Sequence, residues 1–399
     1  MNNTFTPALR FVALSDVHYH DERTVERDRM ARALRIANRV AAQHPSYQNL
    51  DALVVVGDFA TSGSEAQFQA FSRTLNEGLQ AGTRAILSLA SHEYNRGDVA
   101  GAVEKLDRFF HQPPDVHAVI NGFHFISMSP SQGTDYDGEK RAWAAAELAR
   151  AAGADPRRPI FFFQHPHIMD TVAGSIDWGN NELTTLLMHY PQVIDFSGHS
   201  HAPVNDPRSI HQEHFTCLGC GTLSYFELDE YDKYYGTVPP GHENAAQMLI
   251  VEADAQGRVR VTPWNILTDR AFPLLWEIDT PWEPESFLYT RAKRRAAAKA
   301  PRFPAGAALR VEGSRLTFDQ ADHSIEPVLD YYVYIRRMDG SLARKFSLWS
   351  EFYFDPMPAA LSLPLEGLTP GTEYAAEVVA RGFWDNYGAD KLMGRFVAV

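Results

Sequence analysis

Two histidines separated by one residue, His199 and His201, follow a glycine at the end of the apolar run 193–196. A loop that begins where a strand ends can direct both imidazoles toward one point. Neutral imidazole is the commonest transition-metal ligand in proteins, and a metal site needs several donors that converge. A single His-x-His pair is weak evidence for such a site, so its meaning depends on the donors that the rest of the chain supplies.

Four further donors occupy the same kind of position, directly after a short apolar run that is typical of a buried strand. They are Asp16, His18, Asp58 and His165. Because this position repeats in separate segments, we interpret these side chains as parts of one site. Mixed imidazole and carboxylate ligation suits Mn, Fe, Zn, Co or Ni. His167 stands two residues beyond His165, and the spacing alone leaves open which of the two imidazoles binds a metal.

The elements that position these residues alternate between strands and helices over the first two-thirds of the chain, which predicts an α/β architecture. Strands are expected at 9–14, 52–56, 85–89, 160–163 and 193–196. Helices are expected at 26–43, 99–110, 139–151 and 181–190, and after the polar turn 61–64. The turn Asn121-Gly122 predicts a hairpin, and mainly strands are expected from 209 to 266.

The last third of the chain differs in pattern from the first part. Residues 280–284 are rich in proline and residues 291–302 are basic, which is typical of a segment between domains. The clear alternation of residues 329–335 and 374–379 predicts an all-β domain. We therefore expect one domain over 1–280, a linker over 281–304 and a small β-sandwich over 305–399.

The composition is that of a folded protein with more than one domain. The 399 residues are 45% hydrophobic and include 24 Phe, 16 Tyr and 7 Trp. The net charge of −13 argues against extended nucleic-acid binding, which requires clustered Lys and Arg. It does not argue against a small anionic substrate, because bound divalent cations dominate the local field.

Only two cysteines occur, Cys217 and Cys220, so no disulfide framework is expected. Their C-x-x-C spacing lies on a strand and turn without a second cysteine pair, and we interpret them as buried thiols rather than as a redox or zinc motif. The N-terminus lacks the basic and apolar regions of a signal peptide, and no run approaches the ~18 apolar residues of a membrane span. A cytoplasmic protein without membrane contact is therefore expected.

With these residues assembled, the chain resembles the calcineurin-like metallophosphoesterase family. The family's order is D-x-H, G-D, G-N-H-[DE], a lone H and then G-H-x-H, each at the carboxyl end of a strand. In this chain the order reads Asp16-Val17-His18, Gly57-Asp58, Ala90-Ser91-His92-Glu93, His165 and Gly198-His199-Ser200-His201. The resemblance covers roughly residues 9–270. It implies two β-sheets packed between helix layers, an α/β/β/α sandwich.

The resemblance also implies a dinuclear metal centre with Mn, Fe or Zn. One divalent cation would be held by Asp16, His18, Asp58 and His201. Asp58 would bridge to a second cation, which His165, His199 and Ser91 complete. A hydroxide generated on the metal pair would attack phosphorus, and His92, outside the metal shell, would stabilise the phosphoryl charge or protonate the leaving oxygen. His92 and Asp58 are therefore the implied catalytic residues, while an exposed polar loop at His92-Glu93 is the alternative.

Two departures from the family pattern bear on function. Ser91 stands where the family has asparagine, and a hydroxyl is a shorter and poorer donor than an amide oxygen. Weak binding of the second metal, and a metal-binding protein with weak or no catalysis, therefore stay open. Residues 59–62 differ from the V-D-R-G of protein Ser/Thr phosphatases, so the chain looks closer to the branch with cyclic-nucleotide and glycerophosphodiester hydrolases. This favours a phosphodiesterase for a small soluble substrate over a nuclease, whose basic stripe the chain lacks.

The C-terminal region resembles a fibronectin type III module. The resemblance rests on residues 368–374, residues 378–380 and the strand-like residues 332–336. Tyr374, which follows a Pro-Gly turn, fits the corner of a sandwich where its hydroxyl bonds back to the loop. Such modules are usually spacers or docking surfaces, so this region does not indicate an activity of its own.

Overall fold

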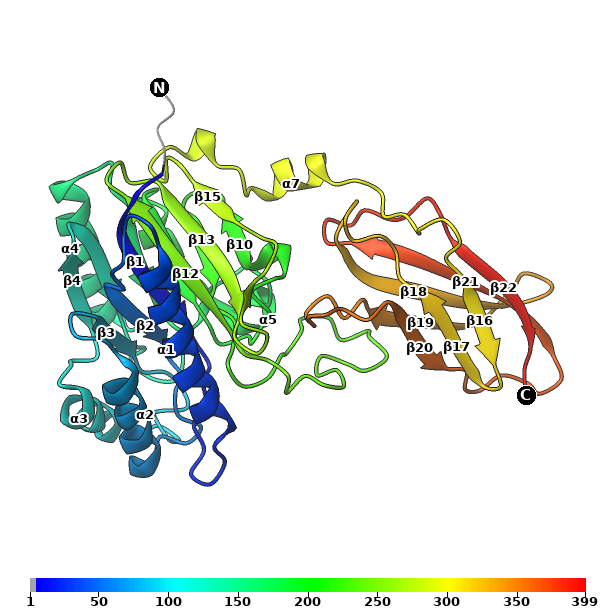
Figure 1. The fold of residues 1–399 in the computed structure, drawn as a ribbon, viewed down its shortest axis with the longest axis horizontal. Helices are drawn as coiled ribbons and strands as arrows, with labels where there is room; N and C mark the ends of the chain where they lie inside the picture. The colour runs from blue at the N-terminus through cyan, green and yellow to red at the C-terminus, as the bar shows by residue number, and fades with distance from the viewer. Residues whose placement is uncertain (1–4) are drawn as a thin grey trace. The chain divides into compact units, whose positions relative to one another are not determined.

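The structure is a computed structural model that describes residues 5–399. The chain forms two compact units; in Figure 1 the first runs from blue to yellow, and the second runs from yellow to red apart from residues 230–240, which are green. The N-terminal unit contains the residues up to 229 together with 241–290. The C-terminal unit contains residues 291–399 together with the segment 230–240, which the chain contributes from within the first unit's sequence. No helix of the described residues is both long and apolar enough to cross a membrane.

The first sheet of the N-terminal unit has seven strands in the order β14-β13-β12-β1-β2-β3, with β15 also paired to β13. Strands β1, β2 and β3 are parallel, and β12 joins β1 in the antiparallel direction. The strands are β1 (Pro7–Leu14), β2 (Ala52–Val56), β3 (Arg84–Ser88), β12 (Gln247–Asp254), β13 (Val259–Asn265), β14 (Arg270–Ala271) and β15 (Trp276–Ile278).

The second sheet has six strands in the order β10-β11-β9-β6-β5-β4, and its four central strands are parallel. The strands are β4 (Val116–Ile120), β5 (Phe123–Ser127), β6 (Ile160–Phe163), β9 (Val193–Ser197), β10 (Ile210–Gln212) and β11 (Thr216–Gly219). Asn121 and Gly122 both have positive φ, the conformation of the tight hairpin turn that this pair predicts.

The two sheets face one another across an aromatic core. The ring of Phe11 on β1 lies 4.9 Å from Phe161 and 5.7 Å from Phe196 of the other sheet, both in edge contacts. The outer faces are covered by helices α1 (Val25–Gln43), α2 (Glu65–Gly78) and α3 (Val99–Phe110) on one side and by α4 (Gly138–Ala154) on the other. Figure 1 shows α1 to α3 beside β1 to β3. This confirms the predicted α/β/β/α sandwich.

Two stretches differ from the secondary structure that the sequence predicts. The helix expected at 181–190 is only the single turn α6 (Thr184–Leu187), since Pro191 disfavours the helical conformation for the residue before it. Mainly strands were expected from 209 to 266, yet none lies between Gly219 and Gln247. This interval contains Gly236, Pro239, Pro240 and Gly241, and these residue types interrupt strands.

The C-terminal unit is a small sandwich of two antiparallel sheets, as the alternating pattern predicts. One sheet has the order β16-β17-β20 and the other β19-β18-β21-β22. The Tyr374 hydroxyl accepts a hydrogen bond from Thr369 N at 3.1 Å, the corner contact expected from the sequence. The strands are β16 (Leu309–Glu312), β17 (Arg315–Asp319), β18 (Val328–Arg337), β19 (Leu342–Trp349), β20 (Ala360–Pro364), β21 (Glu373–Gly382) and β22 (Leu392–Val397).

The boundaries expected from the sequence, 1–280, 281–304 and 305–399, stay a prediction. Contacts divide the chain after Thr290, and the short helix α7 (Arg291–Ala297) lies within the predicted linker. The assignment of 230–240 to the C-terminal unit was not foreseen, because a chain excursion between units leaves no periodic pattern in the sequence.

Candidate metal centre

The predicted donors all emerge from the carboxyl ends of strands. Strand β1 leads to Asp16 and His18, β2 to Asp58, β6 to His165, and β9 to His199 and His201. All of them except His165 have positive φ, between 50° and 72°. Non-glycine residues rarely adopt this conformation, and they persist in it only where the surrounding structure holds them. The strand ends therefore build a tightly held set of loops.

These loops bring the donors together in three overlapping groups. In each group, one ligand atom from every residue lies within 4.8 Å of the others. The groups are Asp16–His18–His201, His18–Asp58–His92 and Asp58–His165–His199. His18 belongs to the first and second groups and Asp58 to the second and third, so the three groups form one continuous set of donors. Ser91 is half-buried and lies between Ala90 and His92 in the loop after β3.

Hydrogen bonds to the backbone fix the orientation of two imidazoles. His165 Nδ1 lies 2.7 Å from Val56 O, so its Nε2 points at Asp58 Oδ2, 3.0 Å away. His201 Nδ1 lies 2.9 Å from Tyr225 O, so its Nε2 points at Asp16 Oδ1, 3.3 Å away. Such outer hydrogen bonds select the tautomer that leaves the inward nitrogen free to bind a metal.

The inward-facing atoms lack the hydrogen-bond partners that buried polar groups normally have. Asp16 Oδ1 and His165 Nε2 are buried and make no hydrogen bond of regular geometry, although His201 Nε2 lies 3.3 Å from the first and Asp58 Oδ2 lies 3.0 Å from the second. His18 Nε2 and His201 Nε2 face each other at 3.1 Å, although His201 already uses its other nitrogen. Convergent lone pairs of this kind are satisfied by a cation between them. The residues present therefore fit a centre for two divalent cations.

The electrostatics of the site also favour cations. Burial alone would raise the pKa of Asp16 and Asp58, but neighbouring imidazoles, His201 and His165 respectively, hold both pKa values below the usual range. Burial lowers the pKa of His165, yet the Asp58 carboxylate raises it to about 10. Burial and the charge of His165 lower the pKa of His199 to about 4. Two buried carboxylates thus create a negative potential that a proton or a metal ion compensates.

His92 stands at the open side of the centre. Its side chain is exposed, its Nδ1 lies 2.7 Å from Thr61 O, and its ring meets His18 edge-on at 4.6 Å between centroids. Its backbone N–H donates to Asp58 Oδ1 at 3.0 Å. The remaining nitrogen, Nε2, is available to a substrate, but His92 is also grouped with His18 and Asp58 as a possible ligand.

Glu93 is fully buried, so the exposed polar loop weighed for His92-Glu93 is wrong for this residue. Its carboxylate accepts hydrogen bonds from the backbone N–H groups of Asp58, Ala60 and Ala90 at 2.7–3.0 Å. Burial, followed by the charge of Asp58, raises the pKa of Glu93. Glu93 therefore connects the loop after β2 to the loop after β3. In the sequence, the only sign of this role is that an acidic residue follows His92.

The two histidines after β6 have different surroundings. His165 points into the centre, whereas both ring nitrogens of buried His167 lie 2.7 Å from serine hydroxyls, Ser197 and Ser200. His167 belongs to none of the donor groups. The ambiguity left by the sequence is thus resolved in favour of His165 as the residue that faces the other donors.

Two aromatic residues that the sequence reasoning missed border the histidines of the last loop. The Tyr225 ring lies 4.1 Å from the His201 ring between centroids, and the Trp178 ring meets His199 edge-on at 5.0 Å. Burial raises the pKa of Tyr225 to about 12, so its phenol keeps its proton at neutral pH. No motif or periodicity marks either residue, because each approaches the site from an irregular segment or a single helical turn.

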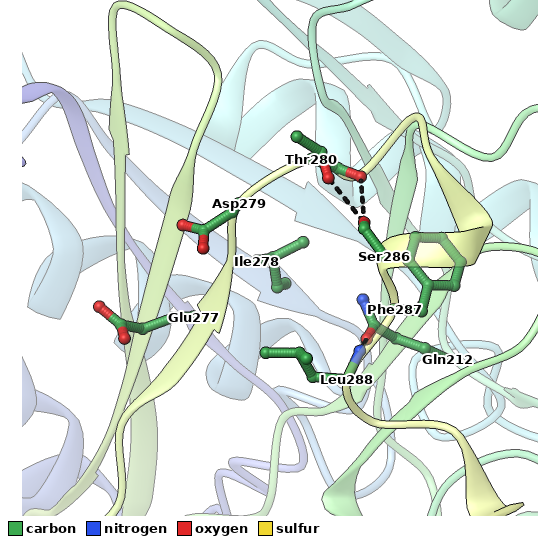
Figure 2. A pocket seen from close by; sticks show the side chains of 8 residues that line it. All are labelled: Gln212, Glu277, Ile278, Asp279, Thr280, Ser286, Phe287 and Leu288. Atoms are coloured by element: carbon green, nitrogen blue, oxygen red, sulfur yellow. Dashed lines mark hydrogen bonds between the residues drawn. The ribbon is translucent and has the colours of Figure 1, made fainter. Parts of the chain in front are cut away.

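A separate small pocket lies in the same unit (Figure 2). It has a volume of about 110 Å³ and is lined by Gln212, Glu277, Ile278, Asp279, Thr280, Ser286, Phe287 and Leu288. Gln212 Oε1 accepts hydrogen bonds from Leu288 N and Tyr289 N, and Thr280 Oγ1 lies 2.6 Å from Ser286 Oγ. None of the donor residues lines this pocket, so it is not part of the metal centre.

The family comparison agrees with the site. Residues 9–203 match the model of the calcineurin-like phosphoesterase family, Metallophos. The match ends before β12 and β13, which complete the first sheet. Comparison with curated proteins gives no match.

Solved structures show distant likeness. A purple acid phosphatase, PPD1 from yellow lupin (Lupinus luteus), is 14% identical with a TM-score of 0.49; the match covers 69% of this chain and 55% of the lupin chain. PhoD is 9% identical with a TM-score of 0.40 and 69% coverage of both chains. The FN1–FN3 domains of chicken CNTN1 are 14% identical with a TM-score of 0.20, covering 39% of this chain and 43% of theirs. The chain thus spans little more than half of the lupin phosphatase.

Proposed function

We propose that the protein is a metal-dependent phosphodiesterase that hydrolyses a small phosphoester at the centre formed by the loops after β1, β2, β6 and β9. The observation that carries the proposal is the overlap of the three donor groups: His18 joins the first group to the second, and Asp58, which lies 3.0 Å from His165 Nε2, joins the second to the third. The family match supports the reaction class. The preference for diesters rests on the sequence after Asp58, which differs from that of protein phosphatases.

The residues divide into two donor sets and a proton donor. Asp16, His18 and His201 would hold one cation with Asp58, and His165 and His199 would hold the other with Asp58 and Ser91. When bound, the pair of cations supplies an acidified water and the positive charge that binds a phosphate. Mn, Fe and Zn all suit these donors.

Two further residues near the centre would support the reaction, one by donating a proton and one by holding the loops in place. His92 would donate its Nε2 proton to the leaving oxygen, while Thr61 O holds its Nδ1. Glu93 keeps Asp58 and Ala90 in register through their backbone N–H groups. We further propose that the C-terminal sandwich is a fibronectin type III-like module that acts as a spacer or docking surface, a reading to which the Tyr374 corner contact contributes.

The test compares hydrolysis of bis(p-nitrophenyl) phosphate with that of p-nitrophenyl phosphate. Metal-free protein would be reconstituted separately with Mn²⁺, Fe²⁺ and Zn²⁺, and Asp58→Asn would serve as the inactive variant. Asp195→Asn is the matched control, because Asp195 is equally buried but belongs to no donor group. We expect faster diester turnover that Asp58→Asn abolishes and Asp195→Asn retains. Metal binding without turnover of either ester would instead favour the non-catalytic metal-binding protein that Ser91 suggests.

A further inference from the structure

His167 links the end of a strand to the middle of the metal-binding loop. Its Nδ1 lies 2.7 Å from Ser197 Oγ, the last residue of β9, and its Nε2 lies 2.7 Å from Ser200 Oγ. Ser200 stands between His199 and His201 in the chain, so the imidazole of His167 holds the residue that separates two of the donors. His167 itself is 1% exposed and comes from the short strand β7 (His167–Ile168).

The loop that His167 holds is conformationally unfavourable on its own. His199 and His201 have φ values of 72° and 56°, a region that costs non-glycine residues free energy. Ser200, between them, makes the backbone contact Ser200 N→Gly198 O at 2.9 Å. A loop with two left-handed residues persists only where side chains fix it. Ser200 is buried and is the residue of this loop whose side chain contacts His167.

The fit around Ser200 is close. A Cβ built on Gly174 would lie 2.4 Å from Ser200 Cβ, and one built on Gly198 would lie 1.9 Å from Ser15 Oγ. Both flanking segments therefore approach at distances that only glycine permits. Because the loop has no room to shift toward either segment, the hydrogen bond from His167 determines the direction in which Ser200 points.

Both ring nitrogens of His167 are hydrogen-bonded to serine hydroxyls in either neutral tautomer. Ser200 Oγ accepts from Ala202 N at 3.2 Å and can give its own hydrogen to His167 Nε2. His167 Nδ1–H then donates to Ser197 Oγ, whose hydrogen points to Leu218 O at 3.5 Å. Burial lowers the pKa of His167 to about 3, in keeping with a neutral ring. In the other tautomer His167 Nε2–H donates to Ser200 Oγ, whose hydrogen has Ala173 O as an acceptor at 3.5 Å, and Ser197 Oγ–H donates to Nδ1. In either tautomer both nitrogens are occupied by hydroxyls, so neither is free to bind a metal.

We propose that His167 is a positioning residue that sets the geometry of the metal centre by locking Ser200, and with it the two imidazoles of His199 and His201. The inference depends on the metal centre of the proposed function but not on its substrate. The link differs from a metal ligand, because its nitrogens are both committed to hydroxyls. It also differs from a purely structural contact, because it acts on Ser200, which lies directly between the donors His199 and His201.

The experiment measures Mn²⁺ binding to metal-free full-length protein by isothermal titration calorimetry, with thermal unfolding of the same metal-free samples. Ser200→Ala removes only a hydroxyl, and His167→Phe keeps the ring without its nitrogens. We expect each to weaken Mn²⁺ binding by about 10–100-fold, the usual effect of altering a residue that orients a ligand. Because both changes break one link, the double variant should bind Mn²⁺ no more weakly than the worse single variant.

Two further variants separate positioning from stability. His167→Gln retains a donor and an acceptor and should recover part of the lost affinity. His211→Phe replaces another buried histidine, on β10 of the six-stranded sheet, and should lower the unfolding temperature without changing Mn²⁺ affinity. Wild-type affinity in Ser200→Ala, or losses that add in the double variant, would overturn the proposal. Absence of phosphoester hydrolysis in the wild type, with the affinities ordered as expected, would contradict only the proposed function.

Discussion

His165 Nε2 lies 3.0 Å from Asp58 Oδ2, with both side chains almost completely buried. In the metal-free protein this contact is an ion pair that holds a proton, because the Asp58 carboxylate raises the pKa of His165 to about 10 against the opposing effect of burial. A metal ion needs the same imidazole neutral. Proton and metal therefore compete for one nitrogen, and the centre should respond to pH in opposite ways with and without metal.

We expect the metal-free protein to lose thermal stability as pH rises. A histidine whose folded-state pKa exceeds the ordinary 6.5 contributes stability below pH 6.5, and this contribution disappears as pH rises to about 10. His201, whose pKa is also raised, acts in the same direction. Unfolding temperatures measured from pH 6.5 to 10 with a chelator and with excess Mn²⁺ test this. A steeper decline with metal than with chelator would contradict it.

Substitution can show whether His92 acts as a proton donor or as a metal ligand. His92→Ala should lower turnover by about 10²–10⁴-fold, the usual range for acid–base catalysis, because the proton donor to the leaving oxygen is lost. The bound metal, measured by elemental analysis, should stay at the wild-type amount. His18→Ala is the control that should lose metal. Loss of metal from His92→Ala would assign His92 to the ligands, as its grouping with His18 and Asp58 permits.

Ser91 stands where the family pattern has asparagine, and this difference can be reversed by substitution. Ser91→Asn should lower the Mn²⁺ concentration needed for half-maximal activity by up to tenfold, which corresponds to about 1.4 kcal/mol for one added ligand. Ala90 is not among the residues with positive φ, so a companion change to glycine is unnecessary. Metal-dependent turnover of the wild type and of the single variant is the measurement. Equal metal dependence of the two would remove Ser91 from the second metal site.

The sequence predicted the fold, and it predicted that the candidate donors lie together, because both depend on where the strands end. Residues 52–56 form a continuous apolar run, and β2 is buried at all five positions and delivers Asp58 directly after it. The same logic located His165 and the His199 loop. The hydrophobic periodicity and the ends of the strands, however, do not show which buried polar groups contact one another. Glu93 and His167 are assigned by three-dimensional contacts alone, since each reaches a backbone or hydroxyl from a different strand end.

Asp195 gives a prediction on stability that is independent of metal. It lies fully buried in the middle of β9, its Oδ1 has no hydrogen-bond partner, and burial raises its pKa well above the usual range. A raised carboxyl pKa means that stability falls as pH rises above the unfolded value near 4. Asp195→Asn should therefore stabilise the protein by about 1–3 kcal/mol at pH 8, the cost of an unsatisfied buried group.

Urea unfolding at pH 5 and pH 8 tests the Asp195 prediction. The gain should be larger at pH 8, where the wild-type carboxyl is closer to ionisation. Asp135→Asn, an exposed aspartate, is the control and should change stability by less than about 0.5 kcal/mol at both pH values. Equal stability of wild type and Asp195→Asn at pH 8 would mean that a water or an unseen partner satisfies the carboxyl.

Lys233 makes the segment 230–240 a structural part of the C-terminal unit. Its side chain is fully buried, with Nζ 2.6 Å from Asp330 and 2.7 Å from Glu230, and it lies 4.8 Å above the Trp349 ring. Replacing it removes one partner of a buried ion pair, which typically costs about 3–5 kcal/mol. Because Arg381 also contacts Asp330, we expect Lys233→Met to cost about 3 kcal/mol, the lower end of that range.

Trp349 reports on this change, since its Nε1 donates to Gly236 O at 3.3 Å within the same unit. Urea unfolding of the full chain, followed by tryptophan fluorescence, should show an earlier transition in Lys233→Met. Lys345→Met is the matched control, because Lys345 lies on β19 but is exposed, so its loss should cost less than about 0.5 kcal/mol. If the two variants unfold alike, the carboxylates around Lys233 do not depend on it, and a sandwich of residues 291–399 alone should then be as stable as the same unit in the full chain.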